Sequence, residues 1–176
     1  EIDKARKIFA DWLEMEPDNP IAEHHFLALG ISEPPSRASD AYVVSVFDTF
    51  AAGFDSKLAL LHYKAPELVG AMAAKILAPA TASLDVLDAG CGTGLCGPLL
   101  RAHARRLTGV DLSPKMLDQA RERGGYDELQ THELTAFIDR HPNSHDLIVS
   151  ADTLCYFGDL AETAAAAARS LRKGGS

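Results

Sequence analysis

Residues Val86–Gly94 read VLDAGCGTG, and this stretch decides the fold that we predict. Its first, apolar residues predict a short buried strand that ends at the acidic residue Asp88. Three glycines follow at every second position, at Gly90, Gly92 and Gly94. Glycine permits backbone conformations that a Cβ atom disfavours, and it lets a ligand lie against bare backbone. The stretch therefore predicts a strand that turns tightly into a helix and presents backbone N–H groups to a ligand.

A second glycine pattern overlaps the first. Gly92-x-Gly94-x-x-Gly97 matches the fingerprint of dinucleotide-binding folds, in which the loop holds a pyrophosphate. The carboxylate of Asp88 would repel a pyrophosphate at short range and would attract a cation such as an ammonium group. We therefore favour a ligand with a positive charge, while dinucleotide binding and a purely structural glycine turn remain the alternatives.

The next segment predicts a second strand of the same kind. Residues Leu107–Asp111 are short, mostly apolar and end in an acid, and the spacing of apolar residues over Leu95–Arg106 predicts a helix between the two strands. The unit has the size of a βαβ motif. Asp111 follows Asp88 by 23 positions, where such folds place a carboxylate that binds ribose hydroxyls. Ser113 then predicts a helix N-cap, with Pro114 at the first helical position.

These motifs resemble those of a known family. The pattern Asp-x-Gly-x-Gly-x-Gly resembles motif I of the Rossmann-like (class I) S-adenosylmethionine-dependent methyltransferases, and Asp111–Leu117 is similar to the segment that follows it. The resemblance covers about residues 42–176 and implies an α/β fold, with a mostly parallel sheet and helices on both faces. It also implies a methyltransferase with S-adenosyl-L-methionine as cofactor and S-adenosyl-L-homocysteine as product.

The resemblance further implies which residues bind the cofactor. Leu112 and Met116 would flank the adenine, Glu133 would contact its amino group, and Tyr63 would touch the methionine end. Core packing for Met116, a surface position for Glu133 and packing of Tyr63 against the sheet remain alternatives. The implied cofactor-binding residues are Tyr63, Asp88, Ala89, Gly90, Cys91, Gly92, Gly94, Asp111, Leu112, Met116, Glu133, Leu134 and Ala151.

Two further strands are predicted, over residues 127–134 and 146–152, and an alanine-rich helix over 159–173. Family members continue into a fifth strand and a terminal hairpin, so we expect a chain truncated after its fourth strand. The stretch Ser150–Phe157 resembles the family's motif IV and should face the methyl group. Candidates for a general base are Asp152, Tyr156 and His62. No sequence spacing supports any of them in this role, so the catalytic residue is left unassigned.

The first 30 residues have a different character. The pattern Ala5-x-x-x-Phe9, together with Trp12 and the turn over residues 17–20, resembles part of a tetratricopeptide repeat. About one unit is present where roughly three are needed for stability, and chance helical patterning is the alternative. We therefore expect a helical remnant over residues 1–30, a linker over 31–41, and the cofactor-binding domain over 42–176.

Composition limits the partners. The 176 residues are 47% apolar and 24% charged, and the net charge of −8 disfavours a nucleic-acid substrate. No apolar run reaches the length of a membrane span. The three cysteines (Cys91, Cys96 and Cys155) form no metal-binding pattern and fit reduced thiols in a cytoplasmic protein.

We expect methyl transfer to a small-molecule or lipid-like acceptor. The alternatives are a non-catalytic module that binds the cofactor or a protein partner, and a protein methyltransferase guided by the repeat-like segment. In both alternatives the protein partner would bind through the N-terminal helices.

Overall fold

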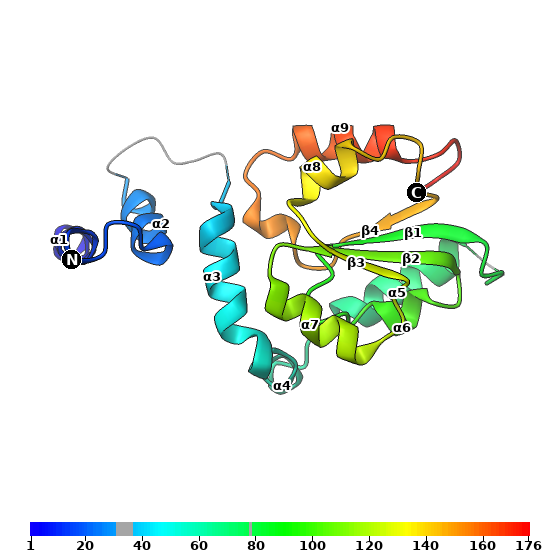
Figure 1. Ribbon diagram of the computed structural model, residues 1–176, viewed down its shortest axis with the longest axis horizontal. Coiled ribbons are helices and arrows are strands. Elements are labelled where there is room, and N and C mark those ends of the chain that lie inside the picture. The colour runs from blue at the N-terminus through cyan, green and yellow to red at the C-terminus, as the bar shows by residue number, and fades with distance from the viewer. Residues whose placement is uncertain (31–36, 78) are drawn as a thin grey trace.

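A four-stranded parallel sheet lies at the centre of the structure, a computed structural model that describes residues 1–30, 37–77 and 79–176 (Figure 1). Its strands are β1 (Leu84–Ala89), β2 (Ala104–Asp111), β3 (Glu128–Thr131) and β4 (Leu147–Val149), in the order β3-β2-β1-β4. All three strand pairs are parallel. The α/β fold with a parallel sheet is therefore confirmed.

Helices cover both faces of this sheet (Figure 1). On one face lie α5 (Ala65–Ile76), α6 (Gly97–Leu100) and α7 (Pro114–Arg123), and on the other lie α8 (Leu134–Asp139) and α9 (Ala161–Ser170). A buried apolar cluster fills each side: Leu100 and Leu107 belong to the first, and Phe137 and Ala166 to the second. Because both faces are covered, β1 and β4 are apolar through their centres.

The order of the strands determines where a ligand can bind. From β1 the chain continues to β2 and β3 on one side, and it then crosses to β4 on the other side of β1. In open α/β sheets ligands bind at the carboxyl ends of the strands, at such a change of direction. Asp88, near the end of β1, pairs with Gly109 of β2 and Val149 of β4. The predicted acid of the first strand therefore lies at the expected crevice.

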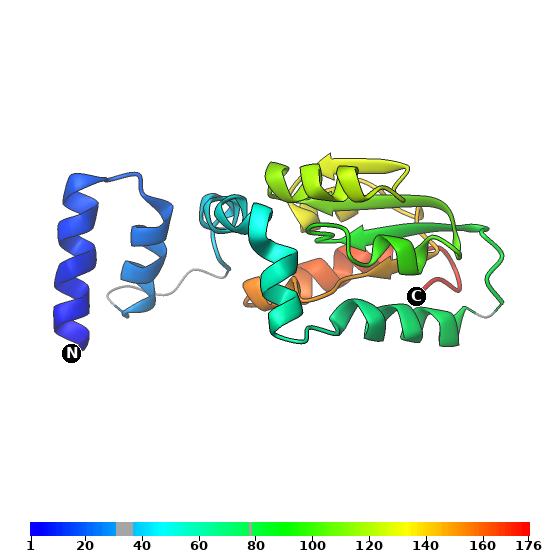
Figure 2. The ribbon, with the colours of Figure 1, turned by 90° about the horizontal axis from the view of Figure 1, so that it is seen from below.

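The N-terminal part of the chain is helical, as predicted. Helices α1 (Ile2–Met15) and α2 (Pro20–Ala28) form a hairpin, and they are followed by α3 (Asp40–Phe50), η1 (Ala51–Gly53) and α4 (Phe54–Leu60). The hairpin lies at one end of the molecule, beyond α3 (Figure 2). The ring of His24 in α2 stacks on Tyr42 of α3, with centroids 3.7 Å apart.

Three predictions about this part stay untested. Residues 31–36 of the predicted linker lie outside the described residues, and α3 begins at Asp40, inside its predicted range. The repeat-like character of the hairpin and the division into domains remain predictions.

Across the described ranges, every helix falls short of the length and apolar character that a bilayer crossing requires.

Several elements differ in extent from the prediction. The helix expected over 95–106 is only α6, because β2 begins earlier, at Ala104, which pairs with Leu84. The third strand is β3 alone, since Glu133 is already the N-cap of α8. The fourth strand is Leu147–Val149, after which the Ser150 hydroxyl donates to the carbonyl of Ala89 at 2.8 Å. In each case polar residues at the ends of the element made its boundary difficult to predict.

Candidate functional site

The glycine stretch forms a tight turn at the end of β1. The backbone N–H groups of Gly90 and Cys91 both donate to the carbonyl of Val110, at 2.8 and 3.0 Å, so the turn folds back onto β2. Gly92 has a φ of +54°, and a Cβ atom built there would meet no atom of the described part of the chain within 4 Å. The backbone at Gly92 therefore faces open space, as expected for a surface against which a ligand lies.

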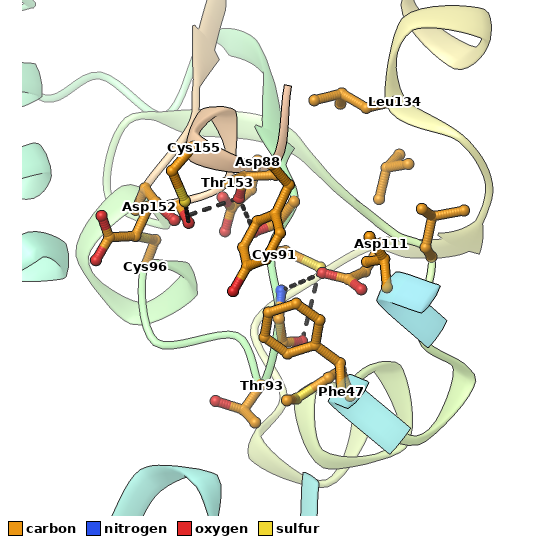
Figure 3. Close-up of a pocket in the computed structure, with 18 of the residues that line it drawn as sticks. Phe47, Asp88, Cys91, Thr93, Cys96, Asp111, Leu134, Asp152, Thr153 and Cys155 are labelled. Atoms are coloured by element: carbon orange, nitrogen blue, oxygen red, sulfur yellow. Dashed lines mark hydrogen bonds between the residues drawn. The ribbon is translucent and has the colours of Figure 1, made fainter. Parts of the chain in front are cut away.

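A cavity of about 380 Å³ opens beside this turn (Figure 3). Its walls come from the carboxyl ends of the strands, from the N-terminal part of α7, and from the helices and loops that precede β1. The apolar part of its wall includes Val43, Phe47, Phe54, Leu58, Tyr156 and Phe157. Its size is within the range of small-molecule sites.

Asp88 is the most buried charged group of the site. Its side chain is 1% exposed, its Oδ2 accepts a hydrogen bond from the Tyr126 hydroxyl at 2.5 Å, and its Oδ1 has no partner among the described residues. Burial raises the pKa of Asp88 to about 7; the Tyr126 hydrogen bond opposes this increase, and the nearby charge of Asp111 adds to it. An unpartnered buried oxygen of this kind favours a ligand that donates a hydrogen bond.

Asp111 holds the glycine turn as well as lining the cavity. Its Oδ2 accepts from the backbone N–H of Gly92 at 2.8 Å, and its Oδ1 accepts from that of Ser113 at 2.9 Å. Burial raises the pKa of Asp111, and these backbone hydrogen bonds oppose the increase. Ser113 caps α7 as predicted, since its hydroxyl accepts from the backbone N–H of Met116 at 3.1 Å.

Two aspartates of the leading helices attach these helices to the site. Asp48 of α3 accepts from the Ser113 hydroxyl at 2.5 Å. Asp55 of α4 accepts from the Thr93 hydroxyl at 2.6 Å and forms an ion pair with Arg123 at the end of α7. Thr93 is only 2% exposed, so its hydroxyl depends on this partner. The helices α3 and α4 are thereby held against the cavity.

The two ends of the cavity differ in chemistry. At one end Glu133 lies beside Leu134, and its carboxylate oxygens accept from the backbone N–H groups of Thr135 and Ala136, at 3.1 and 2.7 Å. At the other end, Tyr63 and Asp152 line the wall. Burial and then the charge and hydrogen bond of Asp152 raise the pKa of Tyr63 to about 12. The structure therefore brings the carboxyl group of Asp152, which follows β4, together with the neutral phenol of Tyr63, which precedes α5.

Most of the predicted site residues meet at this cavity. Ala89 and Gly94 do not line it. Ala89 is 1% exposed and packs in the core on the α8 side, and a Cβ at Gly94 would contact Ala120 and Tyr126. Those that line it are Tyr63, Asp88, Gly90, Cys91, Gly92, Asp111, Leu112, Met116, Glu133, Leu134 and Ala151.

Sequence reasoning missed three residues that shape the site: Thr93, Tyr126 and Thr153. Thr153 follows β4 and its hydroxyl donates to the carbonyl of Gly90 at 3.1 Å. A Cβ at Gly90 would lie 2.2 Å from the same hydroxyl oxygen, so this glycine makes room for Thr153. No sequence signal marks these contacts, because each joins residues that lie far apart along the chain.

Comparisons with known proteins agree with the geometry. The methyltransferase domain family matches residues 87–176. Human methyltransferase-like protein 27 is 40% identical over 84 residues, which are 47% of this chain and 34% of the relative. The malonyl-[acyl-carrier protein] O-methyltransferase of Serratia marcescens is 31% identical over 136 residues, or 76% of this chain and 49% of the relative.

A solved structure extends the likeness to the fold. The TehB-like SAM-dependent methyltransferase of Corynebacterium glutamicum superposes with a TM-score of 0.56 at 25% identity, over 74% of this chain and 70% of that one. Against the two curated relatives, the present chain spans about half of their length or less.

Proposed function

Since the chain belongs to the class I S-adenosylmethionine-dependent methyltransferases, we propose that it binds this cofactor in the cavity beside Gly92 and methylates a small-molecule or lipid-like acceptor. The observation that carries the proposal is the charge of the site. The acids Asp88, Asp111 and Glu133 line the cavity. Among the described residues that line it, Arg37 is the one arginine or lysine, and it is paired with Asp40 at 2.6 Å. Such a site favours a cationic ligand and disfavours a pyrophosphate.

The residues present fit the cofactor. The unpartnered Oδ1 of Asp88 is suited to accept a hydrogen bond from an ammonium group. Asp111 would accept from the ribose hydroxyls through the lone pairs that its two backbone hydrogen bonds leave free. Leu112, Met116 and Leu134 supply apolar surface for the adenine, and Glu133 an acceptor for its amino group.

The acceptor would lie at the end of the cavity formed by Tyr63 and the segment after β4. When bound, S-adenosylmethionine supplies a methyl group on a positively charged sulfur, open to displacement by an acceptor. The task of this chain is then to align the acceptor and to exclude water. Phe47, Tyr156 and Phe157 give that end an apolar wall, which supports an acceptor with an apolar body. The name of the Serratia relative, an enzyme that acts on a carried acyl group, supports the same class.

A second function has one observation in its favour. Helix α1 exposes Ile2, Ile8 and Met15, and neither α1 nor α2 lines the cavity. These apolar side chains are available to a protein partner. In that case the hairpin would recruit a protein, either as the methyl acceptor or as the partner of a module without turnover.

The test compares ligands by isothermal titration calorimetry. We expect S-adenosylhomocysteine to bind and NAD⁺ to give no heat under the same conditions. Tight binding of NAD⁺ without binding of S-adenosylhomocysteine would refute the proposal. Transfer of a radiolabelled methyl group to extracted lipids or small acids, against transfer to proteins of the same extract, would then separate the two acceptor classes.

A further inference from the structure

The ring of Tyr126 fills a space that three glycines leave beneath the turn. Tyr126 comes from the loop between α7 and β3. A Cβ atom at Gly94, Gly97 or Gly109 would lie 3.0, 2.7 or 2.9 Å from a carbon of this ring. The three glycines belong to the turn, to α6 and to β2, so separate elements are shaped around one aromatic side chain. The third glycine of the overlapping dinucleotide-like pattern is thus explained by packing.

The hydroxyl of this ring reaches Asp88. It donates to Oδ2 at 2.5 Å, which leaves Oδ1 as the oxygen without a partner among the described residues. Asp88 lines the cavity and Tyr126 does not. The effect of the Tyr126 hydroxyl on a bound ligand is therefore expected to act through Asp88.

We infer that Tyr126 is a positioning residue, which holds the Asp88 carboxylate with one oxygen free for the ligand. The inference rests on the proposed function, in which Asp88 binds the ammonium group of the cofactor. It adds that the loop before β3 determines the pH range over which the site accepts a cationic ligand.

The surroundings of Asp88 explain why a single hydrogen bond has this influence. The titratable groups that face Asp88 are Asp111, Tyr126 and the thiols of Cys91 and Cys96. Burial raises the pKa of both thiols and of Tyr126, so these three groups stay neutral around pH 7. Asp111 acts against the charged form of Asp88, whereas the hydrogen bond from the Tyr126 hydroxyl favours it.

The test is the Tyr126→Phe variant, which keeps the ring and removes the hydroxyl. Without this donor we expect the pKa of Asp88 to increase by about one pH unit. If only the charged form binds S-adenosylhomocysteine, the variant loses about ninefold in affinity at pH 6.0 and less than about 1.5-fold at pH 8.5. A purely structural role would lower affinity by the same factor at every pH, and that result would overturn the inference.

Two controls make the comparison specific. Tyr42→Phe removes a tyrosine hydroxyl outside the cavity and should leave affinity unchanged at each pH. In the Asp88→Asn background, Tyr126→Phe should change affinity by less than about twofold, because the two side chains act as one pair. A large loss in that background would show that Tyr126 acts by another route.

A second measurement does not depend on the ligand. Protein labelled with carbon-13 at its aspartate carboxyls is titrated by NMR, and the Asp88 signal is identified as the one that disappears in Asp88→Asn. The titration midpoint of this signal should move to higher pH in Tyr126→Phe. An unchanged midpoint would overturn the inference alone. Failure of the wild-type protein to bind S-adenosylhomocysteine between pH 6.0 and 8.5 would instead overturn the proposed function, together with the ligand-binding part of the inference.

Discussion

Replacement of Gly92 by alanine should separate binding from folding. Within residues 1–30, 37–77 and 79–176, the added methyl group would meet no atom closer than 4 Å. Gly92 lines the cavity, so the methyl group enters the space that we assign to the cofactor. Gly30 offers a matched control. It also has a positive φ, +74° against +54°, and a Cβ atom there would meet no atom of the described residues within 4 Å, but it follows α2 and does not line the cavity.

The expected magnitudes follow from this geometry. A left-handed backbone conformation costs an alanine about 1–2 kcal/mol, so both variants should lose stability by similar amounts. For a chain of this size that corresponds to a decrease in Tm of roughly 2–8 °C. A methyl group forced into a close-packed contact costs about 1–3 kcal/mol more. Gly92→Ala alone should therefore weaken S-adenosylhomocysteine binding by about 5- to 150-fold.

Scanning calorimetry and titration calorimetry on the two variants and the wild type measure both quantities. If Gly92→Ala binds S-adenosylhomocysteine as tightly as the wild type, the cofactor does not lie against this glycine and our assignment of the turn is wrong. If Gly30→Ala loses as much affinity, the loss reflects general destabilisation and not contact with the ligand.

Three further outcomes are expected. Asp111→Asn should weaken S-adenosylhomocysteine binding at least tenfold in a titration, since it removes a charge and a hydrogen-bond acceptor from the ligand-facing carboxylate. Asp55→Ala should lower the free energy of unfolding by about 1–3 kcal/mol in a urea titration, because the buried Thr93 hydroxyl loses its acceptor. A decrease below about 0.5 kcal/mol, which is the size typical of surface substitutions, would contradict this expectation. Burial raises the pKa of Asp88 to about 7 in the folded state, above its usual value of 3.8, so its neutral form favours folding. That contribution is complete below about pH 4 and is lost as pH rises through 7, so the Tm of Asp88→Asn should increase relative to wild type between pH 5 and 8, and parallel Tm curves would refute the assignment.

The strands that carry the site could be predicted because their signals are local. Each of β1 and β2 is a short apolar run that ends in an acid, and the glycines and Ser113 mark the turns that follow. The start of β2 was missed because Arg105 and Arg106 interrupt its apolar pattern. In the structure these arginines pair with Asp85 of β1 and Glu128 of β3, so they are the polar end of a central strand.

Glu133 illustrates the same limit within the site. Its predicted place was the end of a strand over 127–134, whereas the structure makes it the N-cap of α8. It lines the cavity all the same, because the cap of α8 and the end of β3 lie at the same edge of the sheet. The residue was found, but the local reason for its position was not.

By itself, the sequence determined the order of strand, glycine turn and helix, and the two acids at the strand ends. Only the tertiary structure decided that Tyr126 holds Asp88, and that Asp48 holds the start of α7. These pairs are separated by 38 and 65 residues. Patterns of hydrophobicity and turn residues act within a few positions along the chain, whereas such contacts exist only after the helices have packed on the sheet.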